Sequence, residues 1–552
     1  MSPDESFVRI TPLGGLGEIG LNCLVVETAS SLLVVDCGLM FPDDYLLGVD
    51  ILIPRFDYIL SKRNKLKGIL LTHAHEDHIG ALPWLLPHVK VPIYGSRFTC
   101  ALVENKLKEH FLDRKVESRY VTAGERVEFG DLAVTFLPVH HSIIQGFGLG
   151  FETPVGRVVH SGDFKIDTMP QETPQTDLDL FREFSKPGVR LLLSDSTNVE
   201  REGHSLKERE ITAALRELFA RAPGRIIVTL FSSHIQRIQE VFTLAAEFGR
   251  RVAVSGRSLQ TNIDIASDLG FMKIPPGTSC ETEELARLND AQVVLLVTGS
   301  QGEPLSALAR IASGEHRQLR IHPGDTVIMS SRFIPGNIRA ITRVINNLYR
   351  LGAEVLYEKV QGIHASGHAH REELRMMLHA VAPRFFIPVH GEYRHLVKHC
   401  RLAQECGIAP ERTMPIEDGN PVTFFADSVR FEEKVPSESL CVDGKGVGDV
   451  GHAVLKERQL LGGGGMVAAI LVIDAQTWTI LFGPEVQSKG FIFEQQYSHL
   501  LEDAKCIMLD IFENIPAGDD AKLRERIRSS LRRFFRKALD RDPVVLPLVM
   551  VV

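Results

Sequence analysis

The sequence predicts an α/β protein of several domains. Its 552 residues exceed what one hydrophobic core normally organises. Short β-branched segments alternate with turns in the first two hundred residues, and apolar strands alternate with helical periodicity after them. With 44% hydrophobic and 24% charged residues, the composition is that of an ordinary globular protein.

The first two hundred residues predict a sheet-rich domain with strands at 32–36, 68–71, 132–138 and 157–161. The middle of the chain predicts a second α/β region, which begins with helical periodicity and continues with apolar strands separated by helices. Such strands are typical of a parallel sheet that is buried on both faces. The helix is expected at 206–222 and the strands at 225–231, 251–255, 293–298 and 326–330.

Segment 72–78, Thr-His-Ala-His-Glu-Asp-His, contains three imidazoles and two carboxylates and directly follows an apolar segment. A strand that ends in a short loop can direct His73 and His75 toward one cation while Asp77 and His78 face a second. The alternative, a solvated polar loop, is less favoured because apolar segments flank these charged groups. The motif therefore predicts a two-metal site of the kind used for phosphoryl displacement.

Metal-binding residue types return far downstream, at 364–370 and 388–392. We therefore expect the chain to leave the first domain, form the α/β region as an insertion, and return to complete the first domain. After a polar connector, the apolar segments 466–473 and 544–552 flank a basic helix, which predicts a small α+β domain.

The basic segment 524–537 has two interpretations. Apolar residues at helical spacing predict an amphipathic helix with a solvated basic face, and a dedicated RNA-binding element is the alternative. These apolar residues are Ile527, Leu531, Phe534, Phe535 and Ala538.

The formal net charge of −8 excludes a uniformly basic nucleic-acid-binding protein, although a local positive groove fits an acidic chain. Eight cysteines without a Cys-x-x-Cys pair suggest neither a zinc ribbon nor a disulfide framework. Residues 1–9 lack the pattern of a signal peptide, and no apolar stretch is long enough to span a bilayer. We therefore expect a cytoplasmic protein with no membrane association.

Distinctive motifs lie along the whole chain: Gly14–Gly20, 72–78, His141-Ser142, Ser161–Lys165, Asp195–Asn198, Ser366–Ala369, Pro388–Tyr393, Asp443–Val450 and Leu546-Pro547. With these motifs the chain resembles the ribonuclease J family, which combines a metallo-β-lactamase fold with a β-CASP insertion. The 72–78 motif by itself indicates only the superfamily, whereas the β-CASP and tail motifs narrow the resemblance to one family. The resemblance implies an αββα sandwich, an inserted β-CASP α/β domain and a small α+β C-terminal domain.

The resemblance implies domain boundaries and a ligand set. The first part of the metallo-β-lactamase domain is expected at 1–205, the β-CASP domain at 206–362, the second part at 363–432, a linker at 433–455 and the C-terminal domain at 456–552. The resemblance places His73, His75 and His141 on one metal ion, Asp77, His78 and His390 on the other, and Asp163 between them. Two divalent ions, zinc or alternatively manganese, would activate a water as hydroxide.

Three further residues match family positions around the metal ions. Asp36 matches a residue that orients a metal-ligating imidazole, although a turn-forming Asp after a strand is the alternative. Asp195 and His368 match candidate catalytic positions for proton handling and contact with the scissile phosphate. Buried polar residues with structural partners are the alternative for both.

The candidate RNA and phosphate contacts lie in segments where this chain departs from the family. Gln236, in Ser233-His234-Ile235-Gln236-Arg237, cannot carry the charge of the usual histidine, so weaker selection for 5′-monophosphate ends is expected. In 331–338, Arg332 is added and a glutamate is lost; Arg332 supplies replacement charge or is a surface residue. The candidate contacts are Ser233, His234, Arg332, Ser366, Gly367 and Ala369.

The expected function is hydrolysis of single-stranded RNA in RNA processing and decay, by 5′-to-3′ exonuclease and also endonuclease activity. A β-CASP nuclease that acts on DNA, a catalytically silent RNA-binding paralogue, and a thioester or lactone hydrolase are the alternatives. The retained ligands disfavour the silent paralogue, and the insertion disfavours a small-molecule hydrolase. The resemblance also implies a homodimer or homotetramer assembled through the C-terminal domain.

Overall fold

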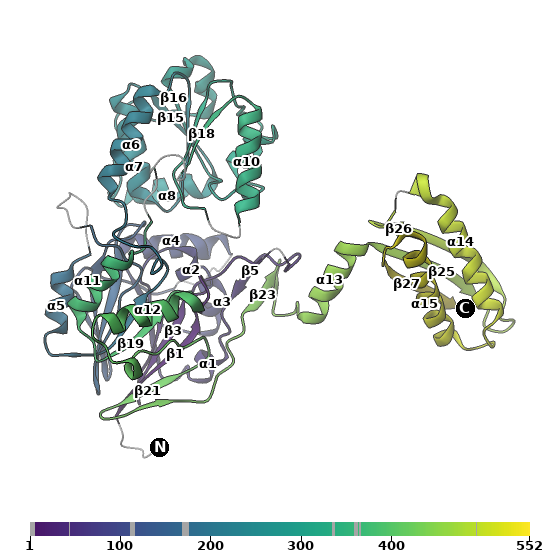
Figure 1. Ribbon diagram of the computed structural model, residues 1–552, viewed down its shortest axis with the longest axis horizontal. Coiled ribbons are helices and arrows are strands. Elements are labelled where there is room, and N and C mark those ends of the chain that lie inside the picture. Colours follow the sequence, from purple (N-terminus) through teal and green to yellow (C-terminus); the bar gives the residue numbers. More distant parts are fainter. Residues whose placement is uncertain are drawn as a thin grey trace. The chain divides into compact units, whose positions relative to one another are not determined.

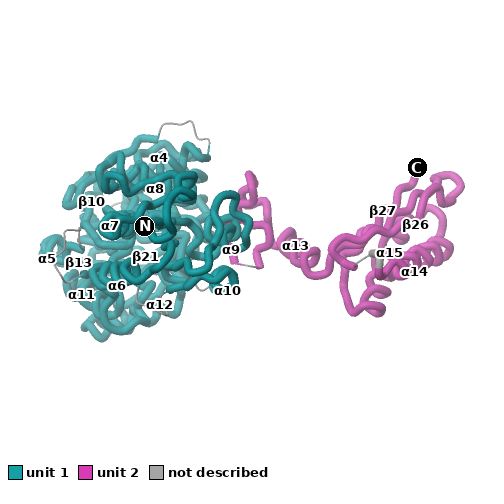
Figure 2. The backbone as a smooth tube through the Cα atoms, turned by 90° about the horizontal axis from the view of Figure 1, so that it is seen from above, with its two compact units in different colours: residues 1–41, 52–440 teal, residues 42–51, 441–552 magenta. Residues whose placement is uncertain are grey.

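The computed structural model describes residues 6–43, 45–110, 116–167, 176–333, 337–357, 363, 366–492 and 494–552 (Figure 1). His364 and the segment 334–336, which belong to predicted motifs, lie outside the described residues. The chain divides into two compact units, one formed by 1–41 and 52–440 and the other by 42–51 and 441–552 (Figure 2).

Two sheets form the centre of the first unit. The larger sheet has the order β22-β21-β1-β3-β4-β6-β7-β8, and the smaller sheet has the order β19-β13-β12-β11-β10-β9. The larger sheet consists of β1 (Phe7–Gly14), β3 (Cys23–Glu27), β4 (Leu32–Val35), β6 (Leu66–Leu70), β7 (Ile93–Gly95), β8 (Ser118–Tyr120), β21 (Val422–Phe425) and β22 (Val429–Phe431). The smaller sheet consists of β9 (Arg126–Phe129), β10 (Leu132–Val139), β11 (Gly146–Thr153), β12 (Gly156–His160), β13 (Val189–Asp195) and β19 (Phe385–Val389).

The two sheets pack face to face through one apolar core. Val26 and Leu33 of the larger sheet lie in the same buried cluster as Phe136 and Leu149 of the smaller sheet. Helices α5 (Leu178–Ser185), α11 (Arg371–Val381) and α12 (Tyr393–Glu405) cover the outer face of the smaller sheet through a second cluster. Helix α4 (Arg97–Glu109) packs against β7 of the larger sheet. The predicted αββα sandwich and its strands are confirmed.

The insertion leaves and re-enters this sandwich between neighbouring strands. β13 and β19 pair in parallel, with Asp195 opposite Val389, although nearly two hundred residues separate them. Between them lies a parallel sheet of order β15-β16-β14-β17-β18, with helices around it (Figure 1). Its elements are α6 (Glu208–Arg221), β14 (Ile226–Thr229), α7 (Ile235–Glu247), β15 (Arg251–Ser255), α8 (Arg257–Asp268), β16 (Val293–Val297), α9 (Ala307–Ala312), β17 (Thr326–Met329), α10 (Ile338–Arg350) and β18 (Glu354–Leu356).

The second unit contains a three-stranded sheet of order β26-β25-β27 and long helices. Helices α14 and α15 share one apolar core with the sheet, as the prediction of a small α+β domain requires. Ala538 is exposed, so its predicted place on the apolar face of the basic helix is wrong. The elements are β23 (Leu440–Asp443), β24 (Gly446–Val447), α13 (His452–Gly464), β25 (Met466–Ile473), β26 (Ile480–Lys489), α14 (Glu494–Glu513), α15 (Asp520–Leu539) and β27 (Val544–Val551).

Two features bear on the remaining sequence expectations. The predicted linker 433–455 contains β23 and β24, and Asp50 N donates to Val442 O at 2.9 Å, so this connector is partly folded. Among the described residues, no helix combines the length and the apolar character that crossing a bilayer requires.

Candidate metal centre

The candidate ligands follow the carboxyl ends of strands from both sheets. His73, His75, Asp77 and His78 follow β6, His141 follows β10, Asp163 follows β12 and His390 follows β19. Because β12 and β19 each pair in parallel with β13, their carboxyl ends meet at the same edge of the sheet. The fold therefore gathers residues that are hundreds of positions apart in sequence.

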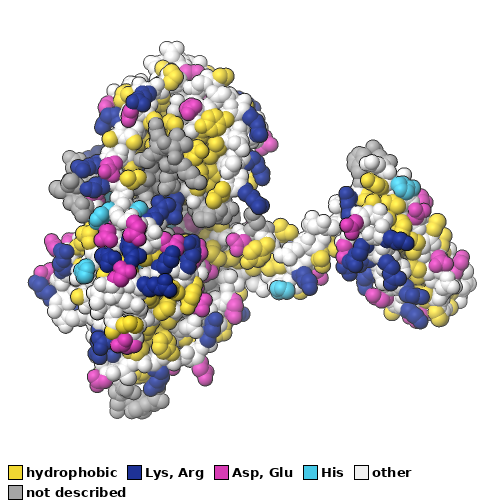
Figure 3. All heavy atoms as spheres, viewed as in Figure 1, with side chains coloured by type: hydrophobic (Ala, Val, Ile, Leu, Met, Phe, Trp, Pro, Cys, Tyr) yellow, Lys and Arg dark blue, Asp and Glu magenta, His cyan; other side chains and the backbone are white. Residues whose placement is uncertain are grey.

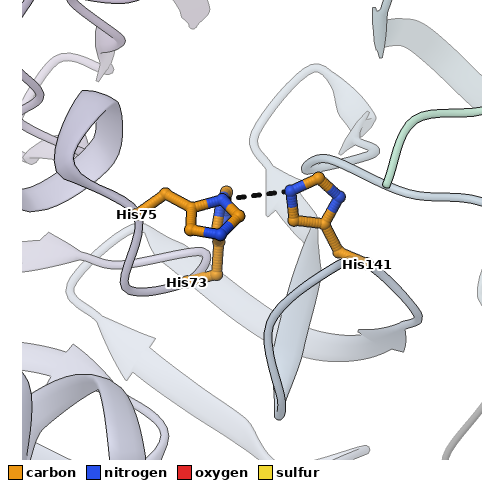
Figure 4. Close-up of side chains that lie close together, drawn as sticks. All are labelled: His73, His75 and His141. Carbon is orange, nitrogen blue, oxygen red and sulfur yellow. Dashed lines mark hydrogen bonds between the residues drawn. The ribbon is translucent and has the colours of Figure 1, made fainter. Parts of the chain in front are cut away.

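Three imidazoles form the first group. His75 Nδ1 lies 3.0 Å from His73 Nε2 and 3.1 Å from His141 Nε2 (Figure 4). Tetrahedral zinc with Zn–N bonds of about 2.0–2.1 Å places its nitrogen ligands about 3.3 Å apart. The spacing of these three nitrogens therefore fits one shared cation.

Two carboxylates and two imidazoles form the second group. Asp77 Oδ2 lies 3.2 Å from His390 Nε2, and Asp163 Oδ2 lies 3.2 Å from His78 Nε2. The same Asp163 oxygen lies 3.9 Å from the Nε2 atoms of His73 and His141. Asp163 Oδ2 is thus within reach of both groups, as a carboxylate between two cations must be.

Hydrogen bonds on the far side of the His141 and His390 rings leave a lone pair of each directed at the centre. Gly367 O can only accept, so His141 Nδ1 carries the proton in their 2.7 Å bond and Nε2 carries the lone pair. Thr197 Oγ1 donates to Asp195 Oδ1 at 2.8 Å, and therefore accepts from His390 Nδ1 at 3.0 Å. Such partners fix the tautomer that a metal ligand needs. The donor set therefore fits divalent metal ions.

Asp36, which directly follows β4, supports the same arrangement. Its carboxylate accepts from Thr72 N, Thr72 Oγ1 and His78 Nδ1, each at 2.8 Å. Because Thr72 Oγ1 donates to Asp36, it accepts from His73 Nδ1 at 3.0 Å. One buried aspartate thus orients His78 directly and His73 through Thr72, which is the geometry expected of an imidazole-orienting residue.

The electrostatics divide the imidazoles into two classes. Burial and the neighbouring His78 hold the pKa of His73 well below its usual range, and burial lowers the pKa of His75 to about 4. For His390, burial alone would lower the pKa, but Asp163, Asp195 and Asp77 raise it to about 10. The carboxylates thus create a strongly negative field around the second group, and this field favours a dication as well as a proton.

Asp195 and His368 lie together beside the ligands. His368 Nδ1 contacts Asp195 Oδ2 at 2.8 Å and lies 3.8 Å from Asp163 Oδ2. The His368 ring packs between those of His141 and His390, with centroid distances of 4.8 and 5.2 Å. Burial alone would raise the pKa of Asp195, but His368 and His390 hold it well below its usual range, so Asp195 is ionised.

The loop that carries His368 permits only glycine at its tip. A Cβ at Gly367 would lie 2.6 Å from His141 Cε1 and 2.8 Å from Ser142 Oγ. Asn198, which sequence reasoning did not place in the site, donates to Ser366 Oγ at 2.6 Å and accepts from Arg332 Nη1 at 2.5 Å. Arg332 and Ser366 are thus joined through one amide at the edge of the centre.

The other predicted phosphate contacts have structural partners. His234 is buried at the N-terminus of α7, where its Nδ1 accepts from Arg237 N at 3.3 Å. Ser233 precedes it and is half-buried. Ala369 is buried in the core, and its N–H donates to Phe164 O at 2.6 Å. A role for these three residues in binding phosphate stays a prediction.

Four family models match the chain in consecutive segments. The metallo-beta-lactamase superfamily matches 16–203, the ribonuclease J beta-CASP domain 223–348, the Zn-dependent metallo-hydrolase RNA specificity domain 352–411, and the ribonuclease J C-terminal domain 453–552. A solved protein of unknown function from Enterococcus faecalis, 13% identical, aligns with a TM-score of 0.52 over 76% of this chain and all of its own, and shares the fold.

Full-length relatives agree with these models. Ribonuclease J of Thermus thermophilus is 40% identical over 99% of this chain and 96% of its own. Ribonuclease J 1 of Streptococcus pyogenes is 37% identical over 100% of this chain and 98% of its own. Ribonuclease J2 of Bacillus subtilis is 35% identical over 99% of both. The relatives are 35–40% identical over essentially the whole chain, and the four family models follow one another along it. The chain therefore belongs to the ribonuclease J family.

Proposed function

We propose that this chain is a metal-dependent ribonuclease that hydrolyses phosphodiester bonds of single-stranded RNA. It removes nucleotides from the 5′ end and also cuts internally, in RNA processing and decay in the cytoplasm. The observation that carries the proposal is the convergence of two ligand groups on Asp163 Oδ2. The matched RNA specificity domain and the names of the relatives support RNA as the substrate.

Seven side chains would hold two divalent ions, zinc or alternatively manganese. His73, His75 and His141 form one group, Asp77, His78 and His390 form the other, and Asp163 lies between them. When bound, such ions supply Lewis acidity toward the phosphate oxygens and lower the pKa of water. The neutral imidazoles of the first group and the ionised carboxylates of the second provide the ligand states that these ions require.

His368 is the residue that we assign to proton handling. Asp195 is ionised and accepts the Nδ1 proton of His368 at 2.8 Å, which fixes the ring and leaves Nε2 to act on the substrate. The His368 ring lies against those of His141 and His390, so it borders the metal centre where the scissile phosphate would bind. We propose that His368 also carries a proton on Nε2, which it first donates as a hydrogen bond to a phosphate oxygen and then transfers to the leaving 3′-oxygen, leaving the ring neutral with its Nδ1 proton still held by Asp195.

The edge formed by Ser366, Asn198 and Arg332 is the proposed contact for the next phosphate. The Arg332 guanidinium supplies positive charge close to the loop that carries His368. Because Gln236 cannot supply charge, we expect binding of a 5′-monophosphate to be less selective than a histidine there would make it.

The test follows 5′-labelled single-stranded RNA that carries either a monophosphate or a triphosphate. The metal-loaded protein is compared with His75→Ala and with His379→Ala, which changes an exposed histidine of α11. Mononucleotide release and internal fragments should disappear in His75→Ala and persist in His379→Ala. Absence of cleavage in all three proteins would refute the proposal.

The same assay separates the alternatives. A DNA strand of the same sequence that is cleaved as fast as RNA would indicate a β-CASP nuclease without selection for the 2′-hydroxyl. RNA binding without cleavage, in protein that retains its metal ions, would indicate a silent paralogue.

We also propose that the chain forms a homodimer or homotetramer through its C-terminal domain, here 456–552, with the other domain boundaries as expected from the sequence. One face of the β26-β25-β27 sheet packs on helices, whereas Leu546, Leu548 and Met550 of β27 are exposed. Light scattering should give a multiple of the 61.4 kDa chain mass, and Leu548→Asp should shift it toward the monomer. A monomeric wild type would contradict this proposal.

A further inference from the structure

Helix α15 concentrates positive charge in an acidic protein. Its residues 520–539 include eight Lys and Arg and only two Asp and Glu, a net charge of +6, whereas the whole chain has a net charge of −8. Figure 3 shows dark blue side chains gathered on the face of the C-terminal unit that carries α15 in this view. The net charge of this helix is therefore opposite in sign to that of the whole chain.

The basic side chains of α15 form two stripes, and carboxylates neutralise one of them. Arg524 pairs with Asp520 at 2.7 Å and Arg528 pairs with Glu525 at 2.8 Å. Asp542 accepts from two more arginines, at 2.5 Å each. We call this set the paired stripe: Arg524, Arg528, Arg532 and Arg536.

The other stripe has no such partners. All four of its side chains are exposed, and no ion pair or side-chain hydrogen bond joins any of them to the part of the chain that the structure describes. At 100° per residue they lie within about 60° of one another around the helix, and at 1.5 Å per residue they extend over about 22 Å. We call this set the open stripe: Lys522, Arg526, Arg533 and Lys537.

The apolar face of α15 is buried in the core of the C-terminal unit. Leu523, Ile527, Leu531 and Phe535 are each 0% exposed, within the cluster that also holds the sheet and α14. A basic amphipathic helix that binds membranes must bury its apolar face in lipid, and this face is already buried in protein. The helix therefore presents the open stripe on a rigid support, without an apolar surface that would favour a bilayer.

We propose that the open stripe binds the phosphate backbone of single-stranded RNA as a second contact surface outside the metal centre. The inference rests on the proposed ribonuclease function, because that function brings RNA to this protein. A row of unpaired cations complements a polyanion, and exposed Lys and Arg contact phosphates without reading base sequence. The paired stripe contributes far less, because three carboxylates offset its four arginines.

The expected effect follows from counterion release. Four phosphate contacts on a single strand give a slope of about −2.8 in log affinity against log salt concentration. Raising salt fourfold would then weaken the contribution of the open stripe about 50-fold. Loss of the stripe should raise KM for a long RNA at low salt and make KM less dependent on salt, while kcat is unchanged.

The test compares three full-length, metal-loaded proteins on a long unstructured RNA and on a trinucleotide, at several salt concentrations. They are the wild type, the open-stripe variant Lys522→Gln/Arg526→Gln/Arg533→Gln/Lys537→Gln, and the paired-stripe variant Arg524→Gln/Arg528→Gln/Arg532→Gln/Arg536→Gln. Both variants lose four positive charges from the same helix, so only the position of the charge differs. Thermal unfolding of each variant controls for folding.

The proposal predicts a raised KM for the long RNA in the open-stripe variant, a much smaller change in the paired-stripe variant, and equal turnover of the trinucleotide in all three. Equal effects of both variants, or no effect of either, would overturn it. Binding to phosphatidylglycerol vesicles that depends on the open stripe, with KM unchanged, would also overturn it and indicate a lipid surface. If the wild type cleaves neither RNA, the ribonuclease proposal fails. In that case, mobility shifts of the long RNA with the three proteins still test whether the open stripe binds RNA.

Discussion

Glu208 joins the loop of the metal centre to the inserted domain, and its loss should destabilise both. Its carboxylate, only 2% exposed, accepts from Lys165 Nζ at 2.5 Å and from Arg237 Nη2. Lys165 is two residues from Asp163, and Arg237 lies in α7. Burial alone would raise the pKa of Glu208, but the two cations hold it well below its usual range. The carboxylate is therefore charged.

Glu208→Gln keeps the size of the side chain and removes its charge, which leaves Lys165 and Arg237 buried with one fewer carboxylate. Breaking a buried pair in this way costs about 3–5 kcal/mol. An unfolding entropy of about 2.1 cal/mol/K per residue over roughly 400 residues is about 0.8 kcal/mol/K. If the first unit unfolds cooperatively, its Tm should fall by about 4–6 °C.

The assay is calorimetric unfolding of the full-length protein, with Glu247→Gln as the matched control. Glu247 joins the same two helices, α6 and α7, through Arg216 at 3.0 Å, but both side chains of this pair are more than 40% exposed. An exposed pair contributes about 0–1 kcal/mol, so the control should lower Tm by about 1 °C or less. Equal shifts in the two variants would refute the reasoning that burial makes Glu208 critical.

Three further predictions concern single side chains. Asp36→Asn should lower metal affinity about 10–100-fold, because the charge that orients His78 is lost; unchanged affinity in a chelator titration would contradict this. Burial and the neighbouring Glu18 raise the pKa of Asp418 from 3.8 to about 8, so its contribution to stability declines as pH rises between these values. Asp418→Asn should therefore flatten the decline of Tm with pH, and an unaltered Tm profile would be evidence against the raised pKa. Arg332→Ala should raise KM for RNA with little change in metal content; an unchanged KM would place Arg332 outside the RNA path.

Local sequence patterns predicted the insertion and the four candidate ligands of segment 72–78, whereas the sandwich and the full set of seven ligands were implied by the resemblance to the family. The strands of the insertion are continuous apolar segments, and segment 72–78 places four candidate ligands in one short loop. Both signals depend only on residues that are close in sequence. The return of the chain to the first domain was also predictable. Metal-binding residue types recur at 388–392, and they have a role only if this segment lies beside segment 72–78.

Contacts between distant segments were not predictable in this way. Gly367 O fixes the His141 tautomer across 226 residues, and Thr197 joins Asp195 to His390 across 193. A threonine and a glycine carbonyl have no distinctive pattern in sequence, because their role depends on the tertiary fold. Asn198 was not predicted as a site residue for the same reason, although it belongs to the motif Asp195–Asn198.

Surface and connector features were the least predictable. Ala538 has the right spacing for the apolar face of α15 but lies beyond the last buried turn. The connector 433–455 is polar in composition, yet its short strands form hydrogen bonds with a distant segment near Asp50. The local sequence of this connector has weak strand propensity, so it did not indicate strands that form only through tertiary contacts.

The central claim is that seven side chains form one centre for two metal ions. The most direct measurement is the number of zinc or manganese ions retained per chain, by elemental analysis after dialysis, in the wild type, His141→Ala and His390→Ala. The account predicts two ions in the wild type and a loss of about one ion in each variant, because each removes a ligand from a different group. A wild type that retains fewer than two ions, or variants that retain both, would contradict it.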